Sequence, residues 1–188
     1  MRPDTFDPNS PPVITLEMIH GAQKHMISTC IITFSHVLFD AVLSSFPCRN
    51  IAEIPACNGN TPIYAFPFQG KEIGIFLSPI GATAVGTFVS EANWITGADR
   101  FVMFGSAGCL NREATLGKLV VPTEAYRDEG ISYHYAPAAP YIKLPNAPRV
   151  AALLEEWGAP YVAGRVWTTD AIFRETRSKV EARKAEGC

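Results

Sequence analysis

Charged side chains are scarce in this sequence. They make up 18% of the 188 residues, and 16 Lys and Arg nearly balance 18 Asp and Glu, for a formal net charge of −2. A nucleic-acid-binding surface needs an excess of basic residues, and a disordered chain combines high net charge with low hydrophobicity, whereas 47% of these residues are hydrophobic. The composition excludes both classes and favours a globular protein whose small ligand is uncharged or locally anionic.

Long apolar runs and a secretion signal are also missing. No apolar run approaches the roughly 18 residues that a membrane-spanning helix needs, and residues 1–12 show no basic region followed by an apolar one. The five cysteines are odd in number and include no Cys-x-x-Cys pair, which is typical of reduced thiols. We therefore expect a cytoplasmic protein without disulfides that does not enter a membrane.

Metal-ligand and nucleophile motifs are absent from the sequence. The four histidines and the cysteines show none of the usual ligand spacings, and there is no Gly-x-Ser-x-Gly elbow. Cys109 follows a glycine turn but has no nearby sequence partner that would activate its thiol, so we interpret it as a small apolar filler. We expect no metal site.

Strand and helix patterns alternate along the chain. The β-branched apolar run at 26–33 is typical of a buried strand, helical spacing over 35–45 predicts a helix, and Asn58-Gly59 predicts a hairpin turn. A chain of this length buries roughly 70% of its unfolded surface. We predict one α/β domain over residues 1–188, a three-layer sandwich whose mixed, largely parallel sheet is covered by helices on both faces. The other predicted elements are strands at 51–56, 63–68, 72–78, 100–104, 119–123 and 163–168, and helices at 15–25, 83–96, 148–157 and 174–186.

Glycine-rich turns follow two of the predicted strands. Gly81 follows one strand, and Gly105-Ser106-Ala107-Gly108 follows another. Glycines at these positions let backbone N–H groups approach an anion or a sugar, and the Ser106 hydroxyl can donate or accept a hydrogen bond. Alternatively, the glycines only make tight turns. The two turns together favour a cradle for a ligand.

Residues 127–137 gather cationic, acidic and imidazole groups at the end of a predicted strand, where open α/β sheets bind ligands. Arg127 can hold a ligand oxygen, Glu129 can accept a hydroxyl proton, and His134 can exchange a proton near neutral pH. The alternative is structural: Arg127 pairs with Glu129 or Asp128 to brace the loop, and His134 packs in the core. For His134 we favour the structural alternative.

The last polar cluster precedes the predicted C-terminal helix. Phe173 can stack on a planar heterocycle, and Glu175 with Arg177 can read its polar edge. Alternatively, Thr169 or Asp170 caps the helix and the charges lie on a solvated face. Both interpretations stay open on the residues alone.

Four motifs resemble, in this order, the purine nucleoside and uridine phosphorylase superfamily. The resemblance runs from about residue 27 to the end of the chain, and the third motif is the most specific. It implies an α/β sandwich that assembles as a homo-oligomer, either a dimer, a trimer or a hexamer. The motifs are Ile80-Gly-Ala82, Phe104-Gly-Ser-Ala-Gly108, Arg127-x-Glu-Gly-x-Ser-x-His-Tyr135 and Thr168-Thr-Asp170.

The resemblance implies a nucleoside phosphorylase. Inorganic phosphate, as co-substrate, attacks C1′ of a nucleoside and gives ribose 1-phosphate and free base, with no metal or organic cofactor. The transition state is oxocarbenium-like, so the protein orients the reactants and stabilises separated charge. A uridine-like nucleoside is preferred because Glu175 and Arg177 lie near the position of the pyrimidine-reading loop. By resemblance, phosphate and ribose contact Gly81, Ser106 and His36, the base contacts Phe104, Gly108, Phe173, Glu175 and Arg177, and the loop is supported by Arg127, Glu129 and His134.

The sequence departs from the family pattern at two places. Family members commonly carry an arginine before the Gly-Ser turn and another in an early loop, where this chain has Met103 and residues 34–38. Because guanidinium groups bind phosphate tightly, a hydrolytic nucleosidase is an alternative. Members also continue past the point matching Cys188 into a strand with a Met-Glu pair that holds the ribose hydroxyls. We therefore expect a C-terminally incomplete domain, and a catalytically inactive nucleoside-binding domain is the second alternative.

Overall fold

The computed structural model describes residues 5–188, which form two compact units. One unit comprises Asn9–Ser106, and the other combines residues 5–8 with Ala107–Cys188. Within residues 5–188, no helix has the length and apolar character needed to cross a membrane. The one-domain interpretation stays a prediction.

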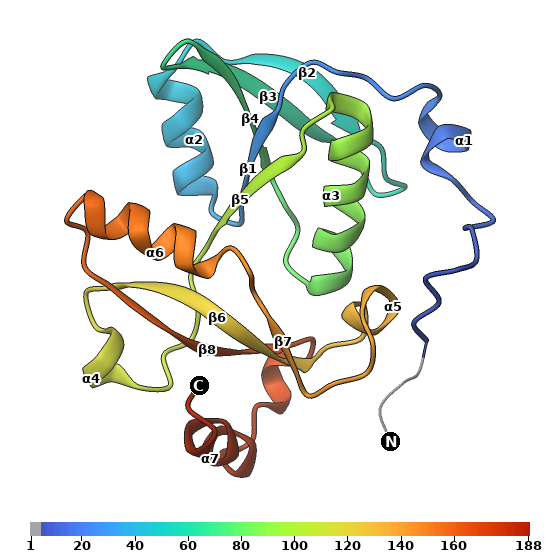
Figure 1. The fold of residues 1–188 in the computed structure, drawn as a ribbon. Coiled ribbons are helices and arrows are strands. Elements are labelled where there is room, and N and C mark those ends of the chain that lie inside the picture. The colour runs from blue at the N-terminus through green and yellow to red at the C-terminus, as the bar shows by residue number, and fades with distance from the viewer. Residues whose placement is uncertain (1–4) are drawn as a thin grey trace. The chain divides into compact units, whose positions relative to one another are not determined.

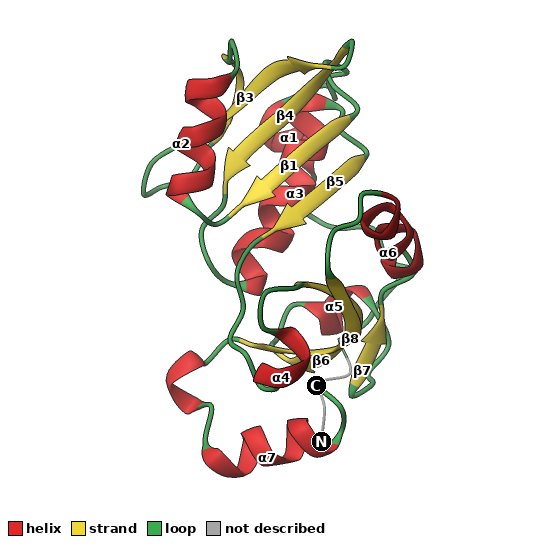
Figure 2. Ribbon diagram, turned by 90° about the vertical axis from the view of Figure 1, so that its left-hand side faces the viewer, coloured by secondary structure: helices red, strands yellow, loops and turns green. Residues whose placement is uncertain are grey.

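The unit Asn9–Ser106 contains a five-stranded mixed sheet. Its strands are β1 (Thr29–Thr33), β2 (Arg49–Ile54), β3 (Thr61–Phe68), β4 (Lys71–Leu77) and β5 (Arg100–Phe104). They lie in the order β2-β3-β4-β1-β5, and Figure 2 shows β3, β4, β1 and β5 side by side. β1 pairs in parallel with β4 and β5, while β3 pairs antiparallel with β4 and β2. The hairpin predicted around Asn58-Gly59 is confirmed as the connection from β2 to β3.

Helices cover both faces of this sheet (Figure 1). They are α1 (Leu16–His20), α2 (His36–Ser45) and α3 (Ala82–Thr96). On one face α3 buries Phe88 and Ala92 in a cluster with Ile32, and on the other face α2 buries Phe39 against Ile75. Successive residues of a strand point to opposite faces, so a sheet covered on both sides needs nearly continuous apolar strands. The predicted α/β fold, with a mixed sheet between helices, is confirmed.

Local signals set the ends of these helices. The Ser35 side chain accepts a hydrogen bond from the Leu38 N–H at 3.3 Å and caps α2. Gly97 ends α3 with a φ of 82°, and a Cβ there would lie 2.6 Å from the carbonyl oxygen of Lys24, so only glycine fits. α2 and α3 therefore match the predicted helices closely, whereas α1 is shorter than predicted because the chain turns at Gly21.

The unit that holds Ala107–Cys188 contains a three-stranded mixed sheet in the order β7-β6-β8. Its strands are β6 (Leu119–Asp128), β7 (Tyr141–Lys143) and β8 (Tyr161–Thr169). Its helices are α4 (Arg112–Thr115), α5 (Ser132–Tyr135), α6 (Ala147–Glu156), the 3-10 helix η1 (Ile172–Arg174) and α7 (Arg177–Ala185). β6 pairs in parallel with β8 and antiparallel with β7. The strand predicted at 119–123 was too short, since pairing with β8 continues to Asp128 opposite Thr169.

Apolar packing holds α6, and charged and aromatic side chains hold α7. In α6, Ala147 and Leu154 are buried together with Val121 of β6. In α7, the Arg183 guanidinium lies 3.6 Å from the ring centroid of Tyr126, and beyond the helix the Tyr141 hydroxyl donates a hydrogen bond to Glu186. Burial, together with the hydrogen bond to Glu186, raises the pKa of Tyr141, so this hydroxyl stays protonated.

Candidate functional site

Three loops of the unit Asn9–Ser106 leave its sheet at the same edge. β1, β4 and β5 run parallel, and Thr33 is in register with both Leu77 and Phe104. The three strands therefore end side by side (Figure 2), and the segments 34–36, 78–81 and 105–106 start from one edge. Open α/β sheets bind ligands at this carboxyl edge.

Hydrogen bonds and close packing hold the first residues of these loops. Thr33 is buried; its carbonyl oxygen accepts from the Ser78 N–H at 2.8 Å, and its hydroxyl accepts from the Ser35 N–H at 3.2 Å. A Cβ at Gly105 would lie 2.9 Å from Cδ2 of Phe34. Gly105 therefore lets the loop after β5 lie directly against the loop after β1.

Gly81 directs the chain from the second of these loops into α3. Its φ of 129° lies in a region that L side chains rarely adopt. Gly81 gives α3 no side-chain cap, and the first turn of this 15-residue helix contains no acidic residue. The first N–H groups of α3 therefore have no side-chain acceptor from the cap position, and such groups attract anions.

Four of the predicted ligand residues lie at this carboxyl edge: His36, Gly81, Phe104 and Ser106. All four are exposed. His36 is the first residue of α2, and Phe104 is the last residue of β5, with 47% of its surface exposed. The strand register brings them to one edge of the sheet, and their contacts with phosphate, ribose or base stay predictions.

The basic residues of this unit all lie away from the carboxyl edge. Arg49, Lys71 and Arg100 are the first residues of β2, β4 and β5, and Lys24 precedes β1. Met103 is 55% exposed where the family pattern has an arginine. Between Asn9 and Ser106, no lysine or arginine stands in the loops that follow the parallel strands.

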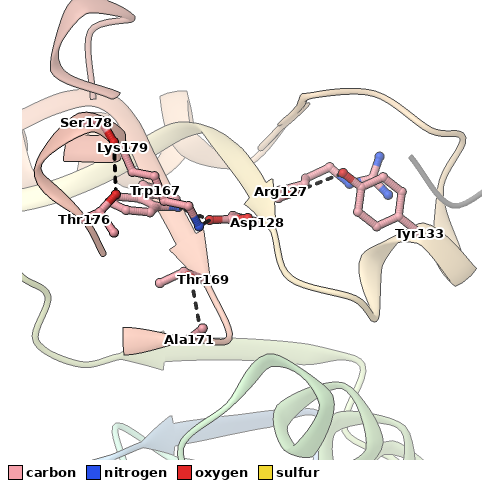
Figure 3. A network of polar contacts seen from close by, with 9 residues as sticks. All are labelled: Arg127, Asp128, Tyr133, Trp167, Thr169, Ala171, Thr176, Ser178 and Lys179. Carbon is pink, nitrogen blue, oxygen red and sulfur yellow. Dashed lines mark hydrogen bonds and ion pairs between the residues drawn. The ribbon is translucent and has the colours of Figure 1, made fainter. Parts of the chain in front are cut away.

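In the other unit, Arg127 braces the loop that follows β6. Arg127 is only 4% exposed, and its guanidinium lies 4.0 Å from the ring centroid of Tyr133. Its Nε donates to Ser132 Oγ at 2.7 Å, Nη1 to the Pro137 carbonyl at 2.7 Å, and Nη2 to the Ala136 carbonyl at 3.3 Å. In return the Tyr133 hydroxyl donates to the Arg127 carbonyl at 3.0 Å (Figure 3). Arg127 therefore lies at the end of a strand and holds the following loop through neutral acceptors.

Glu129 and His134 occupy different environments in this loop. Glu129 accepts from the Ser132 N–H at 2.9 Å and also from the Ser132 hydroxyl. Ser132 thereby links the carboxylate to Arg127, in place of the direct ion pair that the structural alternative predicted. His134 is exposed on α5, so the interpretation of a histidine packed in the core is wrong. The imidazole is accessible because α5 turns its other face, with Tyr133, inward.

The segment after β8 presents Phe173 to solvent. Phe173 lies in η1 and is 97% exposed, and Glu175 and Arg177 are also exposed. The interpretation of Asp170 or Thr169 as the cap of the last helix is wrong. α7 begins later than predicted, after Thr176, and the Asp170 carboxylate instead accepts from the Gly130 N–H at 3.0 Å, while Thr169 Oγ1 accepts from the Ala171 N–H at 3.2 Å.

Asp128 is a central residue that the sequence did not single out for a role of its own. Its Oδ2 accepts from Trp167 Nε1 at 3.2 Å and from Lys179 Nζ at 3.2 Å (Figure 3). Both partners are about 40 or more residues from Asp128 in sequence, so no spacing rule reveals them. The available signal is Trp167 itself, because a partly buried indole N–H usually has an acceptor.

Gly108 and Cys109 are both exposed beyond the turn that follows β5. The apolar-filler interpretation of Cys109 is wrong, because its sulfur is exposed and lies 3.0 Å from Thr115 Oγ1. By contrast Cys30 is buried in β1, where burial raises the pKa of its thiol to about 12, so it is no nucleophile. Over residues 5–188 no group of three or more His, Cys, Asp or Glu is arranged to hold a metal ion.

Comparison with known sequences identifies the family of this chain and a curated relative. The family model of the phosphorylase superfamily matches residues 28–188. The guanosine phosphorylase of Halorubrum lacusprofundi is 26% identical over 136 residues, which are 69% of this chain and 54% of that protein. The chain therefore spans about half the length of this curated relative.

Solved structures share the fold at low sequence identity. Uridine phosphorylase from Vibrio fischeri ES114 aligns with a TM-score of 0.71 and 22% identity, over 88% of this chain and 73% of that chain. Futalosine hydrolase of Helicobacter pylori aligns with a TM-score of 0.65 and 19% identity, over 86% and 75%. The 5′-methylthioadenosine/S-adenosylhomocysteine nucleosidase of Helicobacter pylori aligns with a TM-score of 0.65 and 17% identity, over 86% and 72%. The fold is thus common to enzymes named as phosphorylases and enzymes named as hydrolases or nucleosidases.

Proposed function

The chain belongs to the phosphorylase superfamily, and from this premise we propose that it cleaves the N-glycosidic bond of a nucleoside. The observation that carries the proposal is the shared carboxyl edge, where the loops after β1, β4 and β5 begin side by side. Gly81 and Ser106 belong to two of these loops, and we propose that backbone N–H groups and the Ser106 hydroxyl there contact a sugar or an anion.

The proposed reaction transfers the ribosyl group to phosphate. A phosphate oxygen forms a bond to C1′ while the bond from C1′ to the base nitrogen breaks, and the electron pair of that bond leaves with the base, which is then protonated. The products are ribose 1-phosphate and free base. Because positive charge develops on the sugar and negative charge on the base, the protein accelerates the reaction by holding both in fixed orientation.

Phosphate is the first candidate for the attacking group. The sequence relative from Halorubrum lacusprofundi is named a phosphorylase, and the start of α3 offers N–H groups without a side-chain acceptor from the cap position. We propose that Gly81, Ser106 and His36 contact phosphate and ribose.

Water is the second candidate, and the charge distribution favours it. The basic residues of Asn9–Ser106 lie away from the carboxyl edge, and Met103 supplies no charge. Without guanidinium groups an anionic co-substrate loses much of its electrostatic attraction to the edge, whereas a neutral water molecule has no such attraction to lose. Hydrolysis would release free ribose in place of ribose 1-phosphate.

For the base, we propose an edge that places an acceptor oxygen beside an N–H group, as uracil does. Phe173 is exposed and offers a stacking surface, and Gly108 belongs to the same unit. Glu175 can accept from the base N–H, and Arg177 can donate to the oxygen. Guanine carries the same pair of groups, whereas cytosine and adenine replace the oxygen with an amino group.

The test is release of free base from uridine, guanosine, cytidine and adenosine, each with and without added inorganic phosphate. The proposal predicts cleavage of uridine first and of guanosine next, dependent on phosphate. Cleavage of equal rate without phosphate assigns the nucleosidase reaction instead. Binding of a nucleoside without cleavage assigns the inactive binding domain, and neither binding nor cleavage refutes the proposal.

A further inference from the structure

Two loops diverge from the end of the parallel strand pair β6 and β8. The last register pair of these strands is Asp128 with Thr169. Beyond it, one loop continues through Gly130 toward α5, and the other carries Phe173 toward α7. Both loops belong to the unit that contains Ala107–Cys188.

Asp170 joins the two loops just beyond this register pair. Its backbone N–H donates to the carbonyl oxygen of Asp128 at 3.2 Å, which extends the ladder by one bond. Its carboxylate Oδ2 accepts from the Gly130 N–H at 3.0 Å. A charged acceptor makes the stronger kind of hydrogen bond to a backbone N–H, and this one connects residues 40 positions apart.

Asp128 fixes the far end of the Phe173 loop. Its Oδ2 accepts from Lys179 Nζ in α7 and from the Trp167 indole in β8, both at 3.2 Å (Figure 3). The Phe173 loop is thus held at its start by Asp170 and at its end by Asp128. Phe173 is 97% exposed and supplies no packing of its own. The two carboxylates connect the ends of the loop to residues remote in sequence, whereas Thr169 makes only a local contact, with the Ala171 N–H.

We propose that Asp170 is a positioning residue that fixes the loop of Phe173 relative to the loop of residues 129–137, with Asp128 as its partner at the other end. For its effect on substrate this inference rests on the proposed function. The contact of Asp170 with Gly130, which we call the brace, does not rest on the proposed function. It predicts that the two loops move together whether or not a nucleoside binds.

The test measures amide hydrogen exchange in three forms of the full chain: the wild type, Asp170→Ala and Asp170→Asn. Loss of a bond to a charged acceptor predicts a roughly tenfold rise in exchange at Gly130 and in both loops for Asp170→Ala. Asp170→Asn keeps an acceptor but removes its charge, so we expect a smaller rise. β6 and β8 keep their protection in both variants.

Two control variants should leave hydrogen exchange in both loops unchanged. Glu155→Gln removes an exposed carboxylate from α6 in the same unit, and we expect no change in either loop. Gly130→Ala keeps the donor N–H, and its Cβ would meet only Asp170 Oδ2, at 3.9 Å. We expect this variant to retain protection of both loops.

The KM and kcat for the nucleoside distinguish a positioning role of Asp170 from a role in folding alone. A loop that only binds the base acts on ground state and transition state alike, so Asp170→Ala should raise KM for the nucleoside roughly tenfold with kcat within about twofold of wild type. Unchanged exchange in residues 129–137 overturns the brace, whatever the activity. Raised exchange with an unchanged KM in an active enzyme overturns the positioning role. Raised exchange in a protein that cleaves no nucleoside supports the brace and refutes only the proposed function.

Discussion

Replacing Arg127 by methionine should unfold the loop of residues 129–137 before the rest of its unit. The guanidinium makes three hydrogen bonds, to Ser132 and to the carbonyl oxygens of Ala136 and Pro137, and lies over the ring of Tyr133. Methionine removes all of them and leaves partly buried acceptors without donors. At roughly 1 kcal/mol for each hydrogen bond and somewhat less for the ring contact, we expect a loss of about 3 kcal/mol.

The assay is thermal and urea unfolding of the full chain. The expected loss lowers the melting temperature by about 6 to 12 °C for a protein of this size. Arg127→Lys keeps the charge, but one ammonium group cannot reach three divergent acceptors, so about 2 kcal/mol should be lost. Arg149→Met, on the exposed side of α6, is the matched control and should change stability little. An Arg127→Met variant within about 0.5 kcal/mol of wild type would refute the assignment of Arg127 as the loop brace.

Other predictions concern both units. Burial raises the pKa of Glu91 against an opposing effect of His20, so its stabilising contribution is present at low pH and is lost as pH rises through the raised pKa. Glu91→Gln should abolish this part of the pH dependence of the unfolding free energy. An unchanged dependence of that free energy on pH would contradict its assignment to Glu91. Gly105→Ala should destabilise the protein by about 1–3 kcal/mol in urea unfolding, because its Cβ would lie 2.9 Å from Phe34. Phe173→Ala should leave the melting temperature unchanged yet raise KM for the nucleoside several-fold; a lowered melting temperature would show that Phe173 packs inside.

Local signals made the elements of Asn9–Ser106 predictable from the sequence. The Ser35 cap and the Gly97 stop each depend on neighbouring residues, so pattern and structure agree on α2 and α3. The same holds for the hairpin at Asn58-Gly59. The carboxyl edge follows from the alternation of strands and helices, and with it the common position of Gly81 and Ser106.

The errors lie where distant residues decide the structure. β6 continues to Asp128 because it pairs with β8, which lies about forty residues later, so Arg127 belongs to a strand and not to a loop. The alternative in which Thr169 or Asp170 caps the last helix depends on a local pattern, whereas the observed partner of the Asp170 carboxylate, Gly130, is remote in sequence. The exposure of His134 depends on which face α5 turns inward, and a four-residue helix has no periodicity that fixes this in advance.

The most direct test of the central claim is the mass of the sugar product formed from uridine in heavy-oxygen water with inorganic phosphate present. Attack by phosphate gives free uracil and ribose 1-phosphate without heavy oxygen at C1′, which is the predicted result. Free ribose formed in place of ribose 1-phosphate would assign the attack to water and contradict phosphorolysis. Failure to release base from any of the four nucleosides would contradict N-glycosidic cleavage by this chain.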